Sequence, residues 1–374
     1  MIYVHIPFCK SKCYYCGFYS TVSSSHRKEY FEALVKEIYV RKNFLGDKKA
    51  TNTLYIGGGT PSQLASDEIH LIMDALNEKF IFAPNAEKTI EINPDDVNRK
   101  KLELWKECGF NRVSIGAQTF NNASLKAINR RHTGEQARIA VLQAAEAGFD
   151  NISIDLIMGL PNYTLNDLEK DLKIVLNLPV VHISSYMLSI DLGSVFYKWR
   201  QAGKLKKVSD DVLADMYELM CITLKNNDFD HYEISNFAKN DRWSRHNVGY
   251  WQGKSYIGLG AAAHSYDQHR RYWNVSNIFN YIDHLNRDVR FYEWEELREH
   301  DKYNEYLMTT LRTKWGADID VLFENYAFEW ERSQSKIKSY IANGYAYIKD
   351  NHLILTEAGW LISDKIINEL FFII

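Results

Sequence analysis

The residues with the clearest chemistry in this 374-residue chain are three cysteines near its start. Cys9, Cys13 and Cys16 are spaced C-x3-C-x2-C and follow an apolar segment, 2–6, which the pattern predicts to be a strand ended by Pro7. Three thiolates this close in sequence can bind one metal centre, and thiolate ligands favour zinc or an iron–sulfur cluster. The sequence therefore predicts a metal-binding loop directly after the first strand.

The number of ligands favours one of these metals. A structural zinc site usually has a fourth Cys or His, and none follows within a few residues, because position 18 is Phe18. We favour a four-iron cluster held by three cysteines, with one iron open to a ligand from outside the chain. Two alternatives stay open on the spacing alone: a redox pair of Cys13 and Cys16, or an incomplete zinc site.

The bulk composition indicates a globular protein of the cytoplasm. With 46% hydrophobic and 25% charged residues the chain can bury a core, and its net charge of -3 gives no electrostatic basis for binding nucleic acid. We expect no signal peptide and no integral membrane segment, since no apolar run approaches the roughly 18 residues that a membrane helix needs. An odd number of cysteines, five, is typical of a reducing compartment. Cys108 and Cys221 are predicted to be buried core thiols.

The cysteine loop is followed by segments whose patterns predict secondary structure that could hold it in place. Strand-like segments alternate with amphipathic helical segments, which predicts βαβ units and a parallel sheet. The predicted strands are 53–56, 89–93, 112–118, 151–161 and 182–188, and the clearest predicted helices are 26–42, 67–80 and 135–147.

An internal repeat favours a barrel or partial barrel. ECGFNRVSI (107–115) and EAGFDNISI (146–154) are nearly the same sequence. In both, the glycine is expected to end a helix in a left-handed conformation before the next strand begins. In such a barrel, ligand-binding groups lie at the C-terminal ends of the strands.

The last part of the chain has a different pattern. Helical segments are followed by YAYIKDNHLILT, a predicted hairpin with Asp350 and Asn351 at its turn, and by a last helix over 358–370. This order resembles a winged-helix domain, and because it is not strongly basic we expect a packing or docking role rather than DNA binding. The predicted domains are 1–235, a partial barrel; 236–297, a linking segment; and 298–374, a winged-helix-like domain.

Polar residues follow several predicted strands and could form one site. Gly57 to Thr60 follow the strand 53–56, where glycines let the backbone approach a ligand, although a tight turn would look the same. Glu91 alternates with two isoleucines and is expected to point into the barrel. Three more side chains could reach the same end of the sheet, each with a structural salt bridge or strand-end hydrogen bond as the alternative: Gln118, Arg130 and Asp155.

Together these motifs resemble a known family. YVHIPFCxxxCxYC, GGGTP, EINP, RVSIGAQTF, NRRHT and IDLIMGLP look like the oxygen-independent coproporphyrinogen III oxidase group of radical S-adenosylmethionine (SAM) proteins, in the family's order. The resemblance implies a radical SAM partial (β/α) barrel in which Cys9, Cys13 and Cys16 bind a [4Fe-4S] cluster with SAM at the open iron. The positions that it places around SAM are Tyr3, Tyr15, Gly58, Gly59, Thr60, Glu91, Gln118, Arg130 and Asp155. By this resemblance Arg130 would pair with the SAM carboxylate and Asp155 with the ribose.

Three features indicate the heme chaperone branch of this group. The oxidases have a fourth cysteine where this chain has Phe18, and they carry an extension before the first motif. RHNVGYW matches the HNxxYW motif that the branch associates with heme, so His246 is the predicted heme contact. The alternative is that His246 and Asn247 cap a turn while the two aromatic residues pack between domains. The resemblance thus implies heme as a third cofactor and an unidentified acceptor protein as a partner.

Two other functions remain as alternatives. One is the oxidase reaction itself, the oxidative decarboxylation of two propionates of coproporphyrinogen III to give protoporphyrinogen IX, against which Phe18 argues. The other is a redox or zinc scaffold that uses only Cys13 and Cys16.

Overall fold

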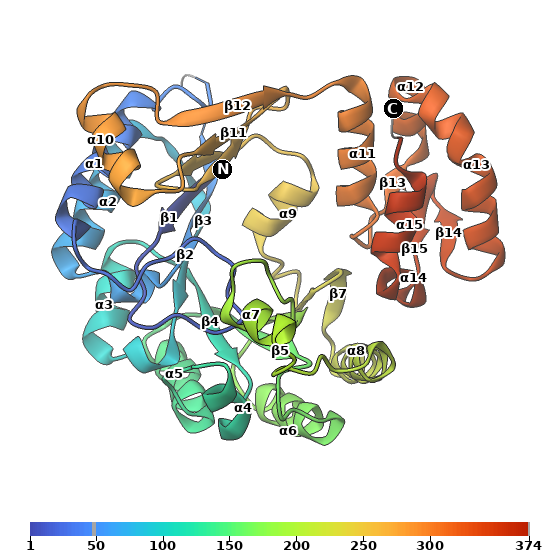
Figure 1. Cartoon of the computed structure of the whole chain (residues 1–374), viewed down its shortest axis with the longest axis horizontal. Helices are drawn as coiled ribbons and strands as arrows, with labels where there is room; N and C mark the ends of the chain where they lie inside the picture. The colour runs from blue at the N-terminus through green and yellow to red at the C-terminus, as the bar shows by residue number, and fades with distance from the viewer. Residues whose placement is uncertain (47–49, 373–374) are drawn as a thin grey trace.

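A nine-stranded sheet forms the body of the molecule in the computed structural model, which describes residues 1–46 and 50–372 (Figure 1). The strand order is β7-β8-β6-β5-β4-β3-β2-β1-β9. Strands β1 to β6 and β9 pair in parallel, and β8 is antiparallel to both β6 and β7. The strands are β1 (Ile2–Ile6), β2 (Thr51–Gly58), β3 (Phe82–Ile92), β4 (Arg112–Gln118), β5 (Asn151–Met158), β6 (His182–Met187), β7 (Asp230–Glu233), β8 (Asn236–Ala238) and β9 (Ile257–Leu259). The predicted α/β fold with a parallel sheet is confirmed.

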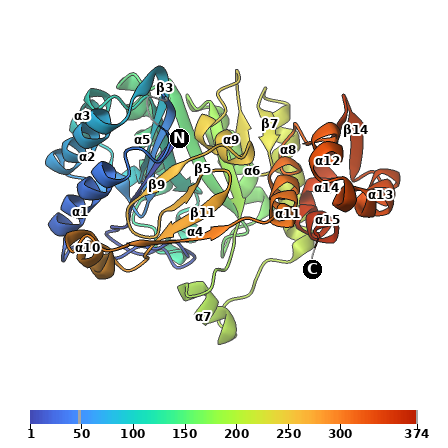
Figure 2. The same ribbon diagram turned by 90° about the horizontal axis from the view of Figure 1, so that it is seen from above.

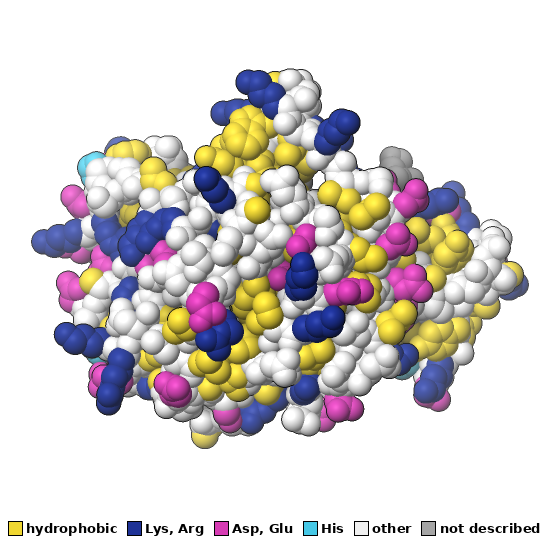
Figure 3. Space-filling model, turned by 90° about the horizontal axis from the view of Figure 1, so that it is seen from below, with side chains coloured by type: hydrophobic (Ala, Val, Ile, Leu, Met, Phe, Trp, Pro, Cys, Tyr) yellow, Lys and Arg dark blue, Asp and Glu magenta, His cyan; other side chains and the backbone are white. Residues whose placement is uncertain are grey.

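Helices cover the outer face of this sheet and follow the strands in turn (Figures 1 and 2). They are α1 (Arg27–Val40), α2 (Ser66–Lys79), α3 (Arg99–Glu107), α4 (Asn122–Ala127), α5 (Gly134–Glu146), α6 (Leu165–Leu176) and α8 (Asp210–Lys225). The short helix α7 (Val195–Gln201) projects from the body, and Figure 3 shows Lys and Arg side chains around hydrophobic ones on this projection. The sequence pattern did not indicate α7.

The predicted repeat is present in the structure. Gly109 and Gly148 end helices α3 and α5 with φ angles of 82° and 85°, the left-handed region that glycine adopts without strain. The aromatic residues that follow them, Phe110 and Phe149, are buried. Each glycine therefore turns the chain from a helix into the next strand, as the sequence predicts.

The sheet separates apolar side chains from polar ones. Ile90 and Ile92 of β3 are buried in the core that the helices cover, and Glu91 between them faces the interior of the partial barrel. The register places Glu91 beside Ser114 of β4, and Asp155 of β5 beside Ser184 of β6. Parallel pairing thus collects polar side chains from several strands on one inner face.

The segment after β8 closes the open side of this interior. Helix α9 (Arg245–Trp251) packs against β2, and β9 pairs with β1. A separate sheet of β10 (His264–Tyr266), β11 (Arg270–Asn274) and β12 (Tyr292–Glu296) follows, with α10 (Ile278–Asn286) beside α1. The segment 236–297 therefore contributes β8 and β9 to the large sheet, and the three predicted domain limits stay a prediction.

The C-terminal part has a sheet and a core of its own. Its helices are α11 (Glu299–Thr310), α12 (Ile319–Asn325), α13 (Ala327–Ala342), α14 (Glu357–Leu361) and α15 (Ser363–Leu370), and its sheet has the order β13-β15-β14. Strands β14 (Ala346–Lys349) and β15 (His352–Leu355) form the predicted hairpin, and β13 is Ala317–Asp318. Asp350 and Asn351 have φ angles of 47° and 62°, as a tight hairpin turn requires.

Two predictions need correction. The last helix is not continuous over 358–370, because Ile362 interrupts it between α14 and α15. Cys221 is buried as predicted, but Cys108 is only half-buried, since it caps the end of α3 rather than lying on the inner face of the helix.

Candidate cofactor site

The cysteine loop is tied to the end of β1 by backbone hydrogen bonds. Thr21 N donates to Pro7 O at 2.7 Å, and Cys9 N donates to Thr21 O at 2.9 Å, so the loop closes on itself. The ring of Tyr14 packs edge-on against Trp199 of α7, with ring centroids 4.9 Å apart. The loop is therefore held at the C-terminal edge of the sheet, where the ends of the other parallel strands also lie.

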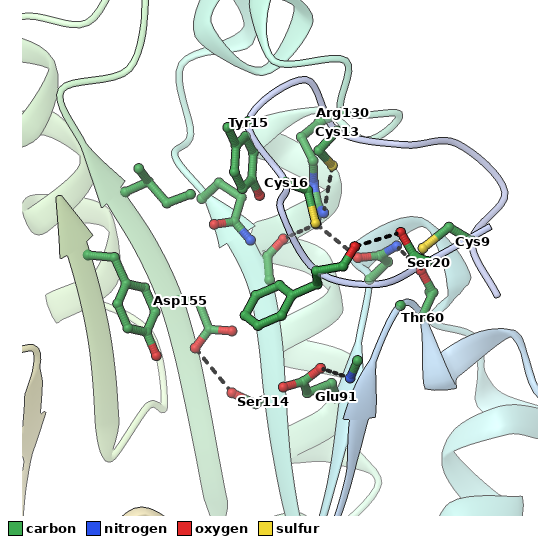
Figure 4. Close-up of a pocket in the computed structure, with 18 of the residues that line it drawn as sticks. Cys9, Cys13, Tyr15, Cys16, Ser20, Thr60, Glu91, Ser114, Arg130 and Asp155 are labelled. Carbon is green, nitrogen blue, oxygen red and sulfur yellow. Dashed lines mark hydrogen bonds between the residues drawn. The ribbon is translucent and has the colours of Figure 1, made fainter. Parts of the chain in front are cut away.

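All three thiols face one pocket of about 450 Å³. Thr60 Oγ1 donates to Cys9 Sγ at 3.4 Å, and Arg130 Nη1 donates to Cys13 Sγ at 3.6 Å (Figure 4). Burial raises the pKa of the Cys9 thiol and raises the pKa of Cys16 to about 11. A buried thiol of this kind becomes a thiolate when a positive centre binds to it, so the donor set suits a thiophilic metal group.

The thiols are not gathered into a ligand geometry. In the part of the chain that the structure describes, no three His, Cys, Asp or Glu side chains are arranged to hold a metal ion. The three cysteines are free and half-buried. Their chemistry and their common pocket fit a cluster.

The glycines after β2 let this strand lie directly against the cysteine loop. A Cβ on Gly59 would lie 2.8 Å from Ile6 O and 3.0 Å from Cys9 Sγ. Gly58 has a φ angle of 110° and is packed against the ring of His5. Glycine is therefore required here by close approach and by backbone conformation, not only by a turn.

Two buried carboxyl groups face the pocket from β3 and β5. Glu91 accepts hydrogen bonds from Tyr55 Oη at 2.8 Å and from Gly58 N at 3.0 Å, and burial raises the pKa of Glu91 to about 7. Ser114 Oγ donates to Asp155 at 3.1 Å, and burial raises the pKa of Asp155 as well (Figure 4). Both groups can accept hydrogen bonds from a polar ligand, and a positively charged ligand group would favour their ionised form.

Arg130 lies beside the cysteine loop. Its guanidinium donates to Asn93 Oδ1 at 2.9 Å and to Gly116 O, in addition to its contact with Cys13. Gln118, at the end of the same strand as Gly116, has a φ angle of 66° and lines the pocket. The strained turn after β4 thus directs polar groups towards the thiols.

Most of the predicted site residues are brought together, and two are not. The pocket is lined by Cys9, Cys13, Tyr15, Cys16, Gly58, Gly59, Thr60, Glu91, Gln118, Arg130 and Asp155. Tyr3 does not line it, because its hydroxyl is hydrogen-bonded to His5 Nδ1 at 3.1 Å and its ring stacks on Tyr55.

His246 lies behind the pocket wall. It is 1% exposed, and its two ring nitrogens are hydrogen-bonded to Thr53 Oγ1 at 2.7 Å and to Tyr250 Oη at 2.9 Å. Burial lowers its pKa to about 3, so the ring is neutral. Both nitrogens are engaged in this structure, and the next residue, Asn247, lines the pocket instead.

Several pocket residues were not predicted from the sequence. They include Arg112, Ser114, Ser184, Tyr186, Asp95, Arg131 and Asn247. The period of two within RVSIGAQ could have identified the first two, since Arg112 and Ser114 alternate with Val113 and Ile115 of the core. Asn247 could not have been found in this way, because its position in the pocket depends on how α9 packs.

None of the helices in the described ranges is long and apolar enough to span a membrane.

Comparison with known proteins places the chain among radical SAM proteins. Residues 3–175 match the model of the radical SAM superfamily. The heme chaperone HemW of Bacillus subtilis is 34% identical over 372 residues, which cover 97% of this chain and 97% of that protein. HemW of Lactococcus lactis is 33% identical over 366 residues, which cover 97% and 95%. Coproporphyrinogen III oxidase (HemN) of Escherichia coli, a radical SAM enzyme, superposes with a TM-score of 0.84 at 25% identity, covering 99% of this chain and 89% of that one.

Proposed function

This chain belongs to the heme chaperone HemW family of radical SAM proteins, and we propose that it binds heme and passes it to an acceptor protein. The observation that carries the proposal is the similarity to heme chaperones over nearly the whole of both chains. Phe18 supports it, because the oxidases of the group have a fourth cysteine at this position. The Phe18 side chain lines the pocket and is 70% exposed.

We propose that Cys9, Cys13 and Cys16 hold a [4Fe-4S] cluster and that SAM occupies the pocket beside it. When bound, such a cluster supplies an electron to SAM. The chain's own groups then orient the cofactor: Arg130 holds the SAM carboxylate, and Asp155 accepts hydrogen bonds from the ribose. Five further groups would contact SAM: Tyr15, Gly58, Gly59, Thr60 and Gln118. Glu91 would accept a hydrogen bond from the amino group of SAM.

Heme binding is proposed for helix α9, which carries the HNxxYW motif. His246 would contact the heme iron only after its hydrogen bonds to Thr53 and Tyr250 have been exchanged. Tyr3, which lies next to this region through Tyr55, would support the same wall of the pocket rather than contact SAM directly. We also propose a cytoplasmic location, which the odd number of cysteines favours.

The proposal is tested with anaerobically reconstituted protein. Hemin is titrated into the wild type and into His246→Ala, and binding is followed by the Soret band. The matched control is His70→Ala, which removes an exposed histidine of α2. We expect one heme per chain in the wild type and the control, and weaker binding in His246→Ala.

A second assay addresses the oxidase alternative. The same protein is given SAM, a reductant and coproporphyrinogen III, and protoporphyrinogen IX is sought as the product. Heme binding without decarboxylation supports the chaperone. Decarboxylation with catalytic turnover would show that Phe18 is no obstacle to the oxidase reaction and would replace the proposal.

A further inference from the structure

The floor of the pocket holds a buried arginine with a side-chain nitrogen that has no hydrogen-bond partner. Arg112 is 1% exposed and lines the pocket, and its Nε is buried without a hydrogen bond. Among residues 1–46 and 50–372, no acceptor lies within hydrogen-bond distance of this Nε. A buried charge is normally paired, because leaving it unpaired costs several kcal/mol. The arginine therefore indicates a group that the chain itself does not supply.

Two carboxyl groups of the pocket that interact electrostatically with Arg112 accept their hydrogen bonds from other groups. Glu91 accepts from Tyr55 and from Gly58 N, and Asp155 accepts from Ser114. The Arg112 charge opposes the burial that raises the pKa values of both acids, so it lies near them without bonding to them. Neither carboxyl group accepts a hydrogen bond from the Arg112 Nε, which is therefore left for a bound ligand.

Arg112 and Arg130 serve opposite ends of the pocket. Arg130 contacts Gly116 O and Cys13 beside the thiols, whereas Arg112 is four residues before Gly116 on the same strand, which corresponds to about 13 Å along β4. Figure 4 shows Ser114 and Glu91 at the end of the pocket away from Cys13 and Arg130, and Arg112 is two residues further in this direction.

We propose that the floor of this pocket is a carboxylate subsite in which Arg112 binds the carboxylate of a bound ligand. The inference rests on the proposed function and extends it to the chemistry of the ligand. A planar guanidinium can bind a carboxylate through two parallel hydrogen bonds. Two ligands of the proposed function carry this group, namely the propionates of heme and the methionine part of SAM. The distance from Arg130 favours a carboxylate other than the one held beside the thiols.

The first test compares ligands with and without the carboxylate. Hemin and hemin dimethyl ester are titrated into the wild type, Arg112→Gln and Arg131→Gln. Arg131 is the matched control, since it lines the same pocket at an exposed edge and is already paired with Asp95 at 2.5 Å. We expect the wild type and the control to prefer hemin by about tenfold or more and Arg112→Gln to lose this preference.

The second test identifies the source of the carboxylate. SAM and 5′-methylthioadenosine, which lacks the carboxylate, are compared on the reconstituted proteins by equilibrium dialysis. If Arg112→Gln weakens SAM alone and hemin is bound no better than its ester, the subsite takes the SAM carboxylate. If neither pair of ligands distinguishes Arg112→Gln from Arg131→Gln, the subsite is overturned.

A further variant and the hemin binding of the wild type distinguish failure of the carboxylate subsite from failure of the proposed function. If Arg112→Gln does not fold, Arg112→Lys takes its place. Lysine keeps the positive charge but cannot form two parallel hydrogen bonds, so its preference for hemin over the dimethyl ester should lie between those of the wild type and of a chain without the charge. A wild type that binds no hemin contradicts the proposed function, and the SAM comparison still decides whether Arg112 holds a carboxylate.

Discussion

At the scale of single residues, the site depends on backbone that approaches the thiols without a side chain in between. Gly59→Ala would place a Cβ 2.8 Å from Ile6 O and 2.9 Å from Phe8 O, both of which are backbone atoms, and 3.0 Å from Cys9 Sγ. We expect the cysteine loop to be displaced, with a loss of about 1–3 kcal/mol of stability and a lower iron content after reconstitution. Iron per chain and thermal unfolding measure the two effects.

The control for this variant is Gly148→Ala. Gly148 has a φ angle of 85° and nothing near its Cβ position, so alanine there costs about 1–2 kcal/mol of backbone strain far from the loop. The control is expected to lose stability and to keep its iron. Full iron content in Gly59→Ala would contradict the requirement for glycine.

A second residue-scale prediction concerns the protonation of Glu91. Burial raises its pKa from 4.5 to about 7, so the folded chain binds this proton more tightly than the unfolded chain does. The contribution of Glu91 to the free energy of unfolding of the apoprotein is therefore fully present below about pH 4.5, and it falls by at most about 3 kcal/mol as the pH rises to 7. Glu91→Gln removes this part of the pH dependence, which denaturant unfolding at several pH values can measure.

A matched control separates stability from binding. Burial also raises the pKa of Glu233 to about 7, and Glu233 lies outside the pocket lining. Glu233→Gln should flatten the stability profile in the same way. Only Glu91→Gln should remove the rise of SAM affinity through about pH 7, since the ionised carboxylate is the form that attracts the SAM amino group. An unchanged pH profile of SAM binding in Glu91→Gln would place this carboxylate outside the SAM site.

At the scale of elements, helix α9 decides whether His246 is accessible. The hydrogen bond between its Nε2 and Tyr250 competes with any iron for the same nitrogen. Tyr250→Phe removes the competitor and keeps the ring, so we expect hemin to bind about fivefold tighter, which corresponds to about one net hydrogen bond. The control is Tyr256→Phe, because Tyr256 packs on Tyr250 without contacting His246. Equal hemin affinity in both variants would mean that this nitrogen does not bind iron.

The helices and strands also show which parts of the fold and of the site could be predicted from the sequence. The strands and the glycine-ended helices could be predicted, because periodicity and left-handed caps such as Gly109 and Gly148 are local properties. The strand-end residues of the pocket could be predicted because parallel strands share one C-terminal edge. The burial of His246 could not, since it depends on α9 packing against β2 from 193 positions away. The period of two could have placed Arg112 on the inner face of β4, but only the folded pocket shows that its Nε has no hydrogen-bond partner.

At the scale of the whole molecule, two hydrophobic cores lie on either side of a seam. One core lies under the large sheet, and the other lies among α11 to α15. The seam joins them through backbone, where Ile234 N donates to Arg312 O, and through the ion pair of Lys314 and Asp230 at 2.6 Å. Trp360 belongs to the second core and also contacts His231 of β7, with ring centroids 4.5 Å apart. The two units are therefore expected to unfold in separable steps.

Trp360→Ala tests this separation. The indole is 5% exposed and donates to Leu311 O at 3.0 Å, so its removal should cost the C-terminal unit about 3–5 kcal/mol. We expect calorimetry to show one transition at lower temperature and a second one unchanged, with full iron content and hemin stoichiometry. Phe323→Ala, which removes a side chain that is 66% exposed on α12, should leave both transitions in place. If Trp360→Ala instead melts in a single step and loses its iron, the two cores are one cooperative unit, and the C-terminal part helps to hold the pocket closed.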